Sequence, residues 1–197
     1  MNIAIFASGG GSNAEVIIKT LAPLLQEKKI ETKIALVLTN NAKAGVLNIA
    51  AQNNIAREII DVKNKTEEEL SSTYLDILTK HHIHFIVLAG YLKKIPNAVT
   101  KAFPQKIINI HPALLPAYGG IGMYGMRVHE AVVLAGEKQS GITIHFVDEV
   151  YDHGKIIFQA RCNLEQGETG KTLAAKILAL EHLHFTKVIA DVIVSLF

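Results

Sequence analysis

Short apolar runs rich in β-branched residues alternate with amphipathic stretches along the first half of this chain. The apolar runs are continuous rather than interrupted by polar residues, which indicates strands that are covered on both faces. Strand–helix–strand repetition requires right-handed crossovers and a mostly parallel sheet. Strands are predicted at residues 2–7, 33–38, 57–60, 84–88 and 106–110, and helices at 13–27, 43–54 and 66–82. The sequence therefore predicts an α/β, Rossmann-like fold with helices on both faces of the sheet.

This alternation ends after Pro116. Residues 117–127 are predicted to form a loop. A helix is predicted at 128–136, strands at 141–147 and 155–162, and one long helix from Thr169 to the C-terminus. Since neither a linker nor a repeat interrupts the pattern, we expect one domain over residues 1–197.

Composition narrows the class of protein. The net charge is +2 and the basic residues are scattered, which does not favour a nucleic-acid surface. No segment reaches the ~18 consecutive apolar residues of a membrane span, and the N-terminus lacks the basic region of a signal peptide. The single cysteine, Cys162, fits a reducing compartment. We therefore expect a cytoplasmic protein with small-molecule substrates and with neither a nucleic-acid nor a membrane partner.

The segment "ASGGGSN", residues 7–13, follows the first predicted strand. Glycines let the backbone approach a ligand, and a helix N-terminus offers unpaired N–H groups to an anion. Ser12 and Asn13 add polar side chains that can cap the helix. The spacing differs from G-x-G-x-x-G, and the second strand ends in "TNNA" without an acidic residue, so NAD is disfavoured. This loop predicts a phosphate site, the alternative being a tight turn that needs glycine only for its geometry.

The segment "NIHPALLP", residues 109–116, places polar groups at the end of a buried strand. Asn109 and His111 are two residues apart and therefore project to the same side, and Pro112 ends the strand. Ligands of open α/β sheets bind outside the carboxyl ends of the strands, where the glycine loop also lies. An amide can stabilise an oxyanion and an imidazole can move a proton near neutral pH. The pair therefore predicts a catalytic site, although either residue alone could be structural.

A carboxylate beside the imidazole would orient it and raise its pKa. The polar segment between the last two predicted strands offers Asp148, Glu149 and Asp152. The same segment could also be a solvated hairpin loop. No metal site is expected: the histidines of "HHIH", residues 81–84, fall at a helix end and a strand start, without cysteine or carboxylate partners in the sequence.

These motifs together resemble the glycinamide ribonucleotide formyltransferase family of folate-dependent enzymes. The resemblance rests on "SGGGSN", "LAGYLKKI", "NIHPALLP", "GITIHFVDEVYDHGKIIFQ" and the "LEH" of the last helix, and it covers almost the whole chain. It implies an N-terminal phosphate-binding half, about residues 1–105, and a catalytic and folate-binding half, about residues 106–197.

The resemblance also implies roles for individual residues. Asn109, His111 and Asp152 match the catalytic trio, with Asp152 raising the pKa of His111. Gly11, Ser12, Asn13 and Glu181 match residues that bind the substrate. The folate site corresponds to Leu92, Lys93, Lys94, Ile95, Asn109, Asp148, Glu149, Val150, Tyr151 and Asp152. His145 and Gln159 fall on family positions without an assigned role.

The implied reaction transfers the formyl group of 10-formyltetrahydrofolate, a co-substrate, to the amine of 5-phosphoribosylglycinamide in purine biosynthesis. No tightly bound cofactor or metal is implied, and the chain is expected to be a monomer or homodimer. Lys93 stands where many members have arginine, His153 replaces a glycine, and the loop before His129 is longer than in the common pattern. The alternatives are another formyl-folate enzyme, such as a formyltetrahydrofolate hydrolase or another amine formyltransferase, and a non-catalytic phosphate-binding module.

Overall fold

The structure is a computed structural model that describes residues 1–196. Its centre is one seven-stranded sheet in the order β3-β2-β1-β4-β5-β6-β7. The strands are β1 (Asn2–Phe6), β2 (Lys33–Thr39), β3 (Ala56–Ile59), β4 (Phe85–Leu88), β5 (Ile107–His111), β6 (Gln139–Phe146) and β7 (Ile156–Asn163). The first five are parallel, whereas β6 pairs antiparallel with β5 and with β7. The predicted α/β class and the mostly parallel sheet are confirmed.

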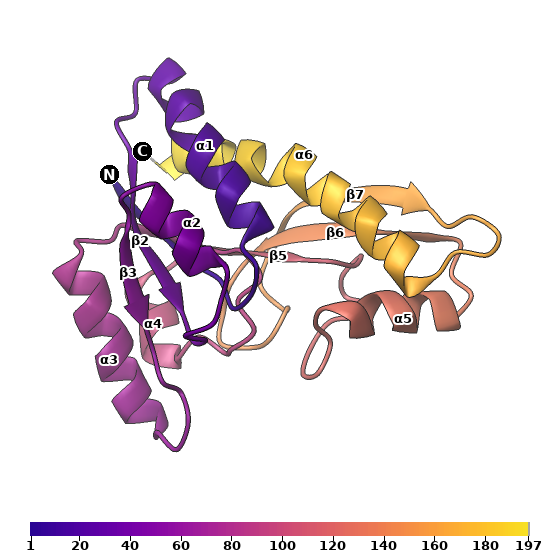
Figure 1. Cartoon of the computed structure of the whole chain (residues 1–197), viewed down its shortest axis with the longest axis horizontal. Coiled ribbons are helices and arrows are strands. Elements are labelled where there is room, and N and C mark those ends of the chain that lie inside the picture. The colour runs from indigo at the N-terminus through magenta and orange to yellow at the C-terminus, as the bar shows by residue number, and fades with distance from the viewer. Residues whose placement is uncertain (197) are drawn as a thin grey trace.

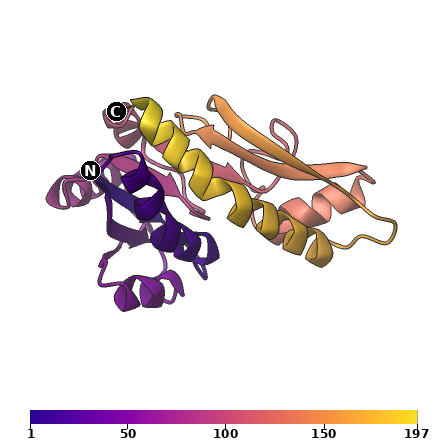
Figure 2. The ribbon, with the colours of Figure 1, turned by 90° about the horizontal axis from the view of Figure 1, so that it is seen from above.

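Helices cover both faces of the sheet (Figure 1). They are α1 (Ser12–Glu27), α2 (Val46–Gln52), α3 (Glu67–Lys80), α4 (Asn97–Ala102), α5 (Met126–Leu134) and α6 (Gly170–Leu196). One apolar core joins the sheet to α1, α2, α5 and α6, and a second joins the opposite face to α3 and α4. Seen from above, α6 runs from the last strands back toward the N-terminal half (Figure 2). The predicted long C-terminal helix is therefore present and connects the two halves.

Local sequence signals account for the ends of two elements. Thr66 and Glu69 form a capping box, since each side chain bonds the other residue's backbone N–H at the start of α3. Strand β5 ends at His111, directly before Pro112, as predicted. Helix α4 was not predicted, because six residues after Pro96 are too few to show a helical period.

Other differences concern boundaries. Helix α2 is shorter than the predicted 43–54, and α5 begins and ends two residues before the predicted 128–136. Within residues 1–196, no helix is both long and apolar enough to span a membrane.

Candidate active site

A cavity of about 620 Å³ opens at the carboxyl ends of the parallel strands. Most of the residues predicted to act there line it: Asn13, Leu92, Lys93, Lys94, Ile95, Asn109, His111, Asp148, Val150, Tyr151, Asp152 and Glu181. Gly11, Ser12 and Glu149 are not among its lining residues. The glycine loop and β5 are thus neighbours at one sheet edge, and Asn13 follows the loop and reaches the cavity.

Strand β5 carries the amide and the imidazole into this cavity. In the antiparallel pairing with β6, Asn109 lies opposite His145 and His111 lies opposite Thr143. The register fixes these pairs because a slip of one residue would turn every side chain to the other face. His111 is only 3% exposed, so its ring is held in place by the surrounding packing.

Asp152 is the carboxylate that joins the imidazoles. Its Oδ2 lies 3.5 Å from Nδ1 of His111, and its Oδ1 lies 3.6 Å from Nε2 of His145. The backbone N–H of Gly120 donates to Oδ2 at 2.9 Å. Burial works against the charge, but the contacts with His145, His111 and Gly120 hold the pKa of Asp152 below its usual value. The carboxylate is therefore ionised at neutral pH and faces both rings.

The other two predicted carboxylates have different partners. Asp148 lies 3.0 Å from Nδ1 of His153, and Glu149 lies 3.5 Å from Nζ of Lys101. Both pairs are largely exposed, so they contribute little to stability. His153, the residue that departs from the family pattern, thus contacts Asp148 rather than Asp152.

The pKa of His111 lies below its usual value, because burial outweighs the attraction of Asp152 and the contact with the carbonyl of Tyr118. The sequence predicted that Asp152 would raise the pKa of His111. Asp152 acts in that direction, as predicted, but the larger effect of burial leaves the net pKa of His111 lowered. A neutral ring is expected at neutral pH, with Nε2–H donating to the carbonyl oxygen of Tyr118 at 2.8 Å.

His145 orients the amide of Asn109, a contact that the sequence did not reveal. Its Nδ1 contacts the carbonyl oxygen of Phe146 at 2.8 Å, so Nδ1 carries the proton. Nε2 then accepts a hydrogen bond from Nδ2 of Asn109 at 3.1 Å. One N–H of the Asn109 amide is used in this bond and the second remains for a ligand. The sequence alone could not predict this contact, because it depends on the pairing register of β5 and β6.

At the other side of the cavity, Asn13 and Glu181 form a buried pair. Nδ2 of Asn13 donates to Oε2 of Glu181 at 2.7 Å, joining α1 to α6. Burial raises the pKa of Glu181, which the bond from Asn13 only partly offsets. The Oδ1 atom of Asn13 is buried without a partner among the described residues, so this pair has unused hydrogen-bonding capacity for a substrate.

The glycine loop ends at Gly11, whose φ of +87° is left-handed. A Cβ at this position would lie 2.8 Å from Cβ of Val46, so glycine is needed both for conformation and for space. Helix α1 has no side-chain cap, which contradicts the prediction that Ser12 or Asn13 caps it. Ser12 is exposed at the first helical position, and Asn13 points to Glu181 instead.

Residues 117–125 form a second glycine-rich loop over the cavity. Gly120, Gly122 and Gly125 all have positive φ. The loop contacts two of the predicted site residues through backbone atoms: the Tyr118 carbonyl contacts His111, and the Gly120 N–H donates to Asp152. Backbone contacts leave no signature in residue types, which is why the sequence could not assign this loop a function.

No group of three or more His, Cys, Asp or Glu side chains within residues 1–196 is arranged to hold a metal ion. His81 instead contacts Glu58 at 3.1 Å, and Nδ1 of His84 accepts the backbone N–H of Asn2. These histidines thus have structural partners.

Comparisons with known proteins place the chain in a family. A family model described as formyl transferase matches residues 1–189. The chain is 39% identical over 192 residues to the chloroplastic phosphoribosylglycinamide formyltransferase of Arabidopsis thaliana, covering 96% of this chain and 64% of the relative. It is 34% identical to the Bacillus subtilis phosphoribosylglycinamide formyltransferase, covering 96% of this chain and 93% of the relative.

A solved structure of phosphoribosylglycinamide formyltransferase from Bacillus halodurans superposes with a TM-score of 0.86 at 33% identity, covering 97% of this chain and 94% of that one. The chain spans 64% and 59% of the lengths of two plant relatives, from Arabidopsis thaliana and Vigna unguiculata. The fold and the cavity define an α/β protein with a ligand site at the carboxyl edge of its sheet. The chain belongs to the formyl transferase family.

Proposed function

We propose that this chain transfers the formyl group of 10-formyltetrahydrofolate to the free amine of 5-phosphoribosylglycinamide, a step of purine biosynthesis. The observation that carries the proposal is the convergence of Asn109, His111 and Asp152 on one cavity that Asn13 and Glu181 also line. Relatives that bear the name of this enzyme cover nearly the full chain, including the Bacillus subtilis protein, which further supports the proposal.

The donor and the acceptor enter from different sides in this scheme. Leu92, Lys93, Lys94 and Ile95 form one wall of the cavity, and Asp148, Val150, Tyr151 and Asp152 another. Leu92 and Tyr151 combine apolar area with partial exposure, which suits the flat ring system of a folate. The glycine loop with Ser12 and Asn13, at the start of α1, would receive the phosphate of the acceptor, and Glu181 its sugar or glycinamide portion.

The chemistry follows from the positions of the three groups. The acceptor amine attacks the formyl carbon, and the carbonyl oxygen becomes an oxyanion. The free N–H of Asn109, held in place by His145, donates to that oxygen. Nδ1 of His111, which carries no proton in the neutral ring because Nε2–H bonds Tyr118, takes the proton that the amine loses. It then delivers this proton to the folate nitrogen as the C–N bond to the folate breaks. The positive charge that forms on His111 during this transfer is stabilised by Asp152, 3.5 Å away.

A direct assay tests the proposal. Purified protein is mixed with phosphoribosylglycinamide and 10-formyltetrahydrofolate, and folate deformylation is followed by absorbance while formylated product is measured by mass spectrometry. We expect deformylation that depends on the amine and matches product one to one. Deformylation without the amine would indicate a hydrolase, and transfer to a different amine would indicate another formyltransferase.

A change at His111 links activity to the site. His111→Ala should abolish turnover while phosphoribosylglycinamide still binds by calorimetry, because the nucleotide contacts lie on α1 and α6. Near wild-type turnover in this variant would remove His111 from the mechanism.

We also propose that the chain acts in the cytoplasm as a monomer or homodimer, without a nucleic-acid or membrane partner. The free cysteine Cys162 is compatible with a reducing compartment. Sedimentation velocity over a range of concentrations tests the assembly, and a species larger than a dimer would contradict it.

A further inference from the structure

His129 is a buried polar residue in the cavity wall that the reaction scheme above leaves without a role. It lies on α5, is only 7% exposed and lines the cavity. Its Nδ1 atom is sealed from solvent and has no hydrogen-bond partner among the described residues. An unpaired buried nitrogen is costly and is normally explained by a missing partner.

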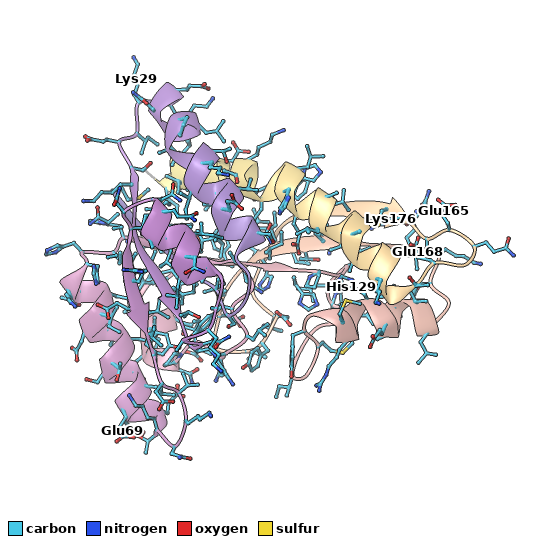
Figure 3. The ribbon with its side chains drawn as sticks, viewed as in Figure 1. Lys29, Glu69, His129, Glu165, Glu168 and Lys176 are labelled. Carbon is cyan, nitrogen blue, oxygen red and sulfur yellow. The ribbon has the colours of Figure 1, made fainter. Side chains whose placement is uncertain are left out.

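His129 lies on the same side of the cavity as Glu181. Helix α5 packs against α6, the helix that carries Glu181, and Figure 3 shows His129 between the ribbons of α5 and α6. The segments proposed to hold the folate, residues 92–95 and 148–152, belong to other loops. His129 therefore borders the acceptor side.

The protonation state of His129 suits contact with an amine. Burial lowers its pKa, and the nearby His111 lowers it further. A neutral imidazole offers one N–H donor and one acceptor nitrogen. It can accept a hydrogen bond from an amine and donate one to an amide carbonyl, and a glycinamide group contains both.

We propose that His129 binds the glycinamide end of the acceptor and holds its amine toward the formyl carbon beside His111. The inference rests on the proposed function and names the group that recognises the acceptor. His129 neither gains nor loses a proton in the reaction, because His111 carries the transferred proton.

A pair of matched variants tests this role. His129→Leu removes both nitrogens at similar volume. His182→Leu is the control, because Nε2 of His182 is also buried and unpaired but the residue does not line the cavity. We expect kcat/KM for phosphoribosylglycinamide to fall roughly 10- to 100-fold in His129→Leu, as for loss of one or two hydrogen bonds. The KM for the formyl-folate should stay within about twofold, and Tm should not fall, because an unpaired polar group has been removed.

His182→Leu should leave all kinetic constants unchanged. A His129→Leu variant with wild-type kinetics for the acceptor would overturn the inference, as would an equal rise in KM for both substrates. His129→Asn, which retains a donor and an acceptor, should recover part of the loss.

A second measurement uses the wild-type protein and does not depend on whether His129→Leu folds. Wild-type protein labelled with 15N-histidine is titrated with phosphoribosylglycinamide alone, and the His129 ring signals are assigned by their absence in His129→Asn. We expect these signals to shift on binding; unchanged signals at saturation refute the contact. If the wild-type protein does not use phosphoribosylglycinamide, the proposed function is refuted, and this inference with it. If the wild-type protein is active and His129→Leu has the same kinetic constants, only the inference is refuted.

Discussion

Replacing Asp152 by asparagine keeps the shape of the side chain but removes its charge from beside two imidazoles. At 3.5 Å from His111, a full charge pair interacts by about 4.7 kcal/mol at an effective dielectric constant of about 20. Loss of half of that attraction in the transition state slows the reaction by about 50-fold, and loss of all of it by about 3000-fold. We therefore expect kcat of Asp152→Asn to fall into this range while the KM of each substrate changes little.

The same substitution has a defined effect on proton binding. Asp152 opposes the effect of burial on His111, so its removal should move the pKa of His111 still further below its usual value. A group whose folded-state pKa is depressed stabilises the fold above its unfolded pKa, and this contribution is lost as the pH falls. Because the proposed reaction needs the neutral ring of His111, a lower pKa of this ring should also move the acid limb of the pH–rate profile to lower pH in Asp152→Asn. NMR titration of the His111 ring measures the shift directly.

Asp61→Asn is the matched control for this experiment. Oδ1 of Asp61 also accepts a backbone N–H, that of Lys63 at 2.9 Å, but Asp61 does not line the cavity. Its substitution should leave kcat and the His111 titration unchanged. The reasoning is refuted if Asp152→Asn retains kcat within about threefold of wild type, or if His111 titrates at higher pH in the variant.

Three further predictions concern the acceptor pocket and the fold. Glu181→Gln should raise the KM for phosphoribosylglycinamide roughly tenfold, through loss of a charged hydrogen-bond acceptor, without lowering Tm; an unchanged KM in steady-state assays would remove Glu181 from binding. Thr66→Ala should lower the free energy of unfolding by about 1 kcal/mol through loss of the capping box, with unchanged activity, as measured by urea denaturation. Gly141→Ala should cost at least about 2 kcal/mol, because its Cβ would lie 1.9 Å from the carbonyl oxygen of Ala160 on the paired strand; a wild-type Tm would contradict that clash.

The sequence was most informative where a structure is specified by neighbouring residues. Continuous apolar runs predicted the buried parallel strands, the Thr66 and Glu69 spacing predicted a capping box, and Pro112 predicted the end of β5. Residue spacing along one strand also predicted that Asn109 and His111 share a side. These features depend on local geometry alone, so a single sequence contains them.

The unpredicted parts of the site depend on contacts between distant segments. His145 contacts Asn109 because the two residues lie opposite each other in the β5–β6 pairing. The His111 ring is hydrogen-bonded to the backbone carbonyl of Tyr118. The raising effect of Asp152 on the pKa of His111 can be inferred from residue types, whereas the depth of burial that outweighs it cannot. Family resemblance predicted which residues form the site, whereas their distances, burial and hydrogen bonds come from the structure.

Helix α6 imposes an order on how this protein can be built during synthesis. It packs against α1 from the first half and against α5, β6 and β7 from the second, and it supplies Leu173, Ile177, Phe185 and Ile189 to the larger core. Until α6 has left the ribosome, the part of the sheet that α6 covers stays exposed and the Asn13 amide lacks Glu181. Docking of α6 therefore completes the larger core and the Asn13–Glu181 pair in the same event.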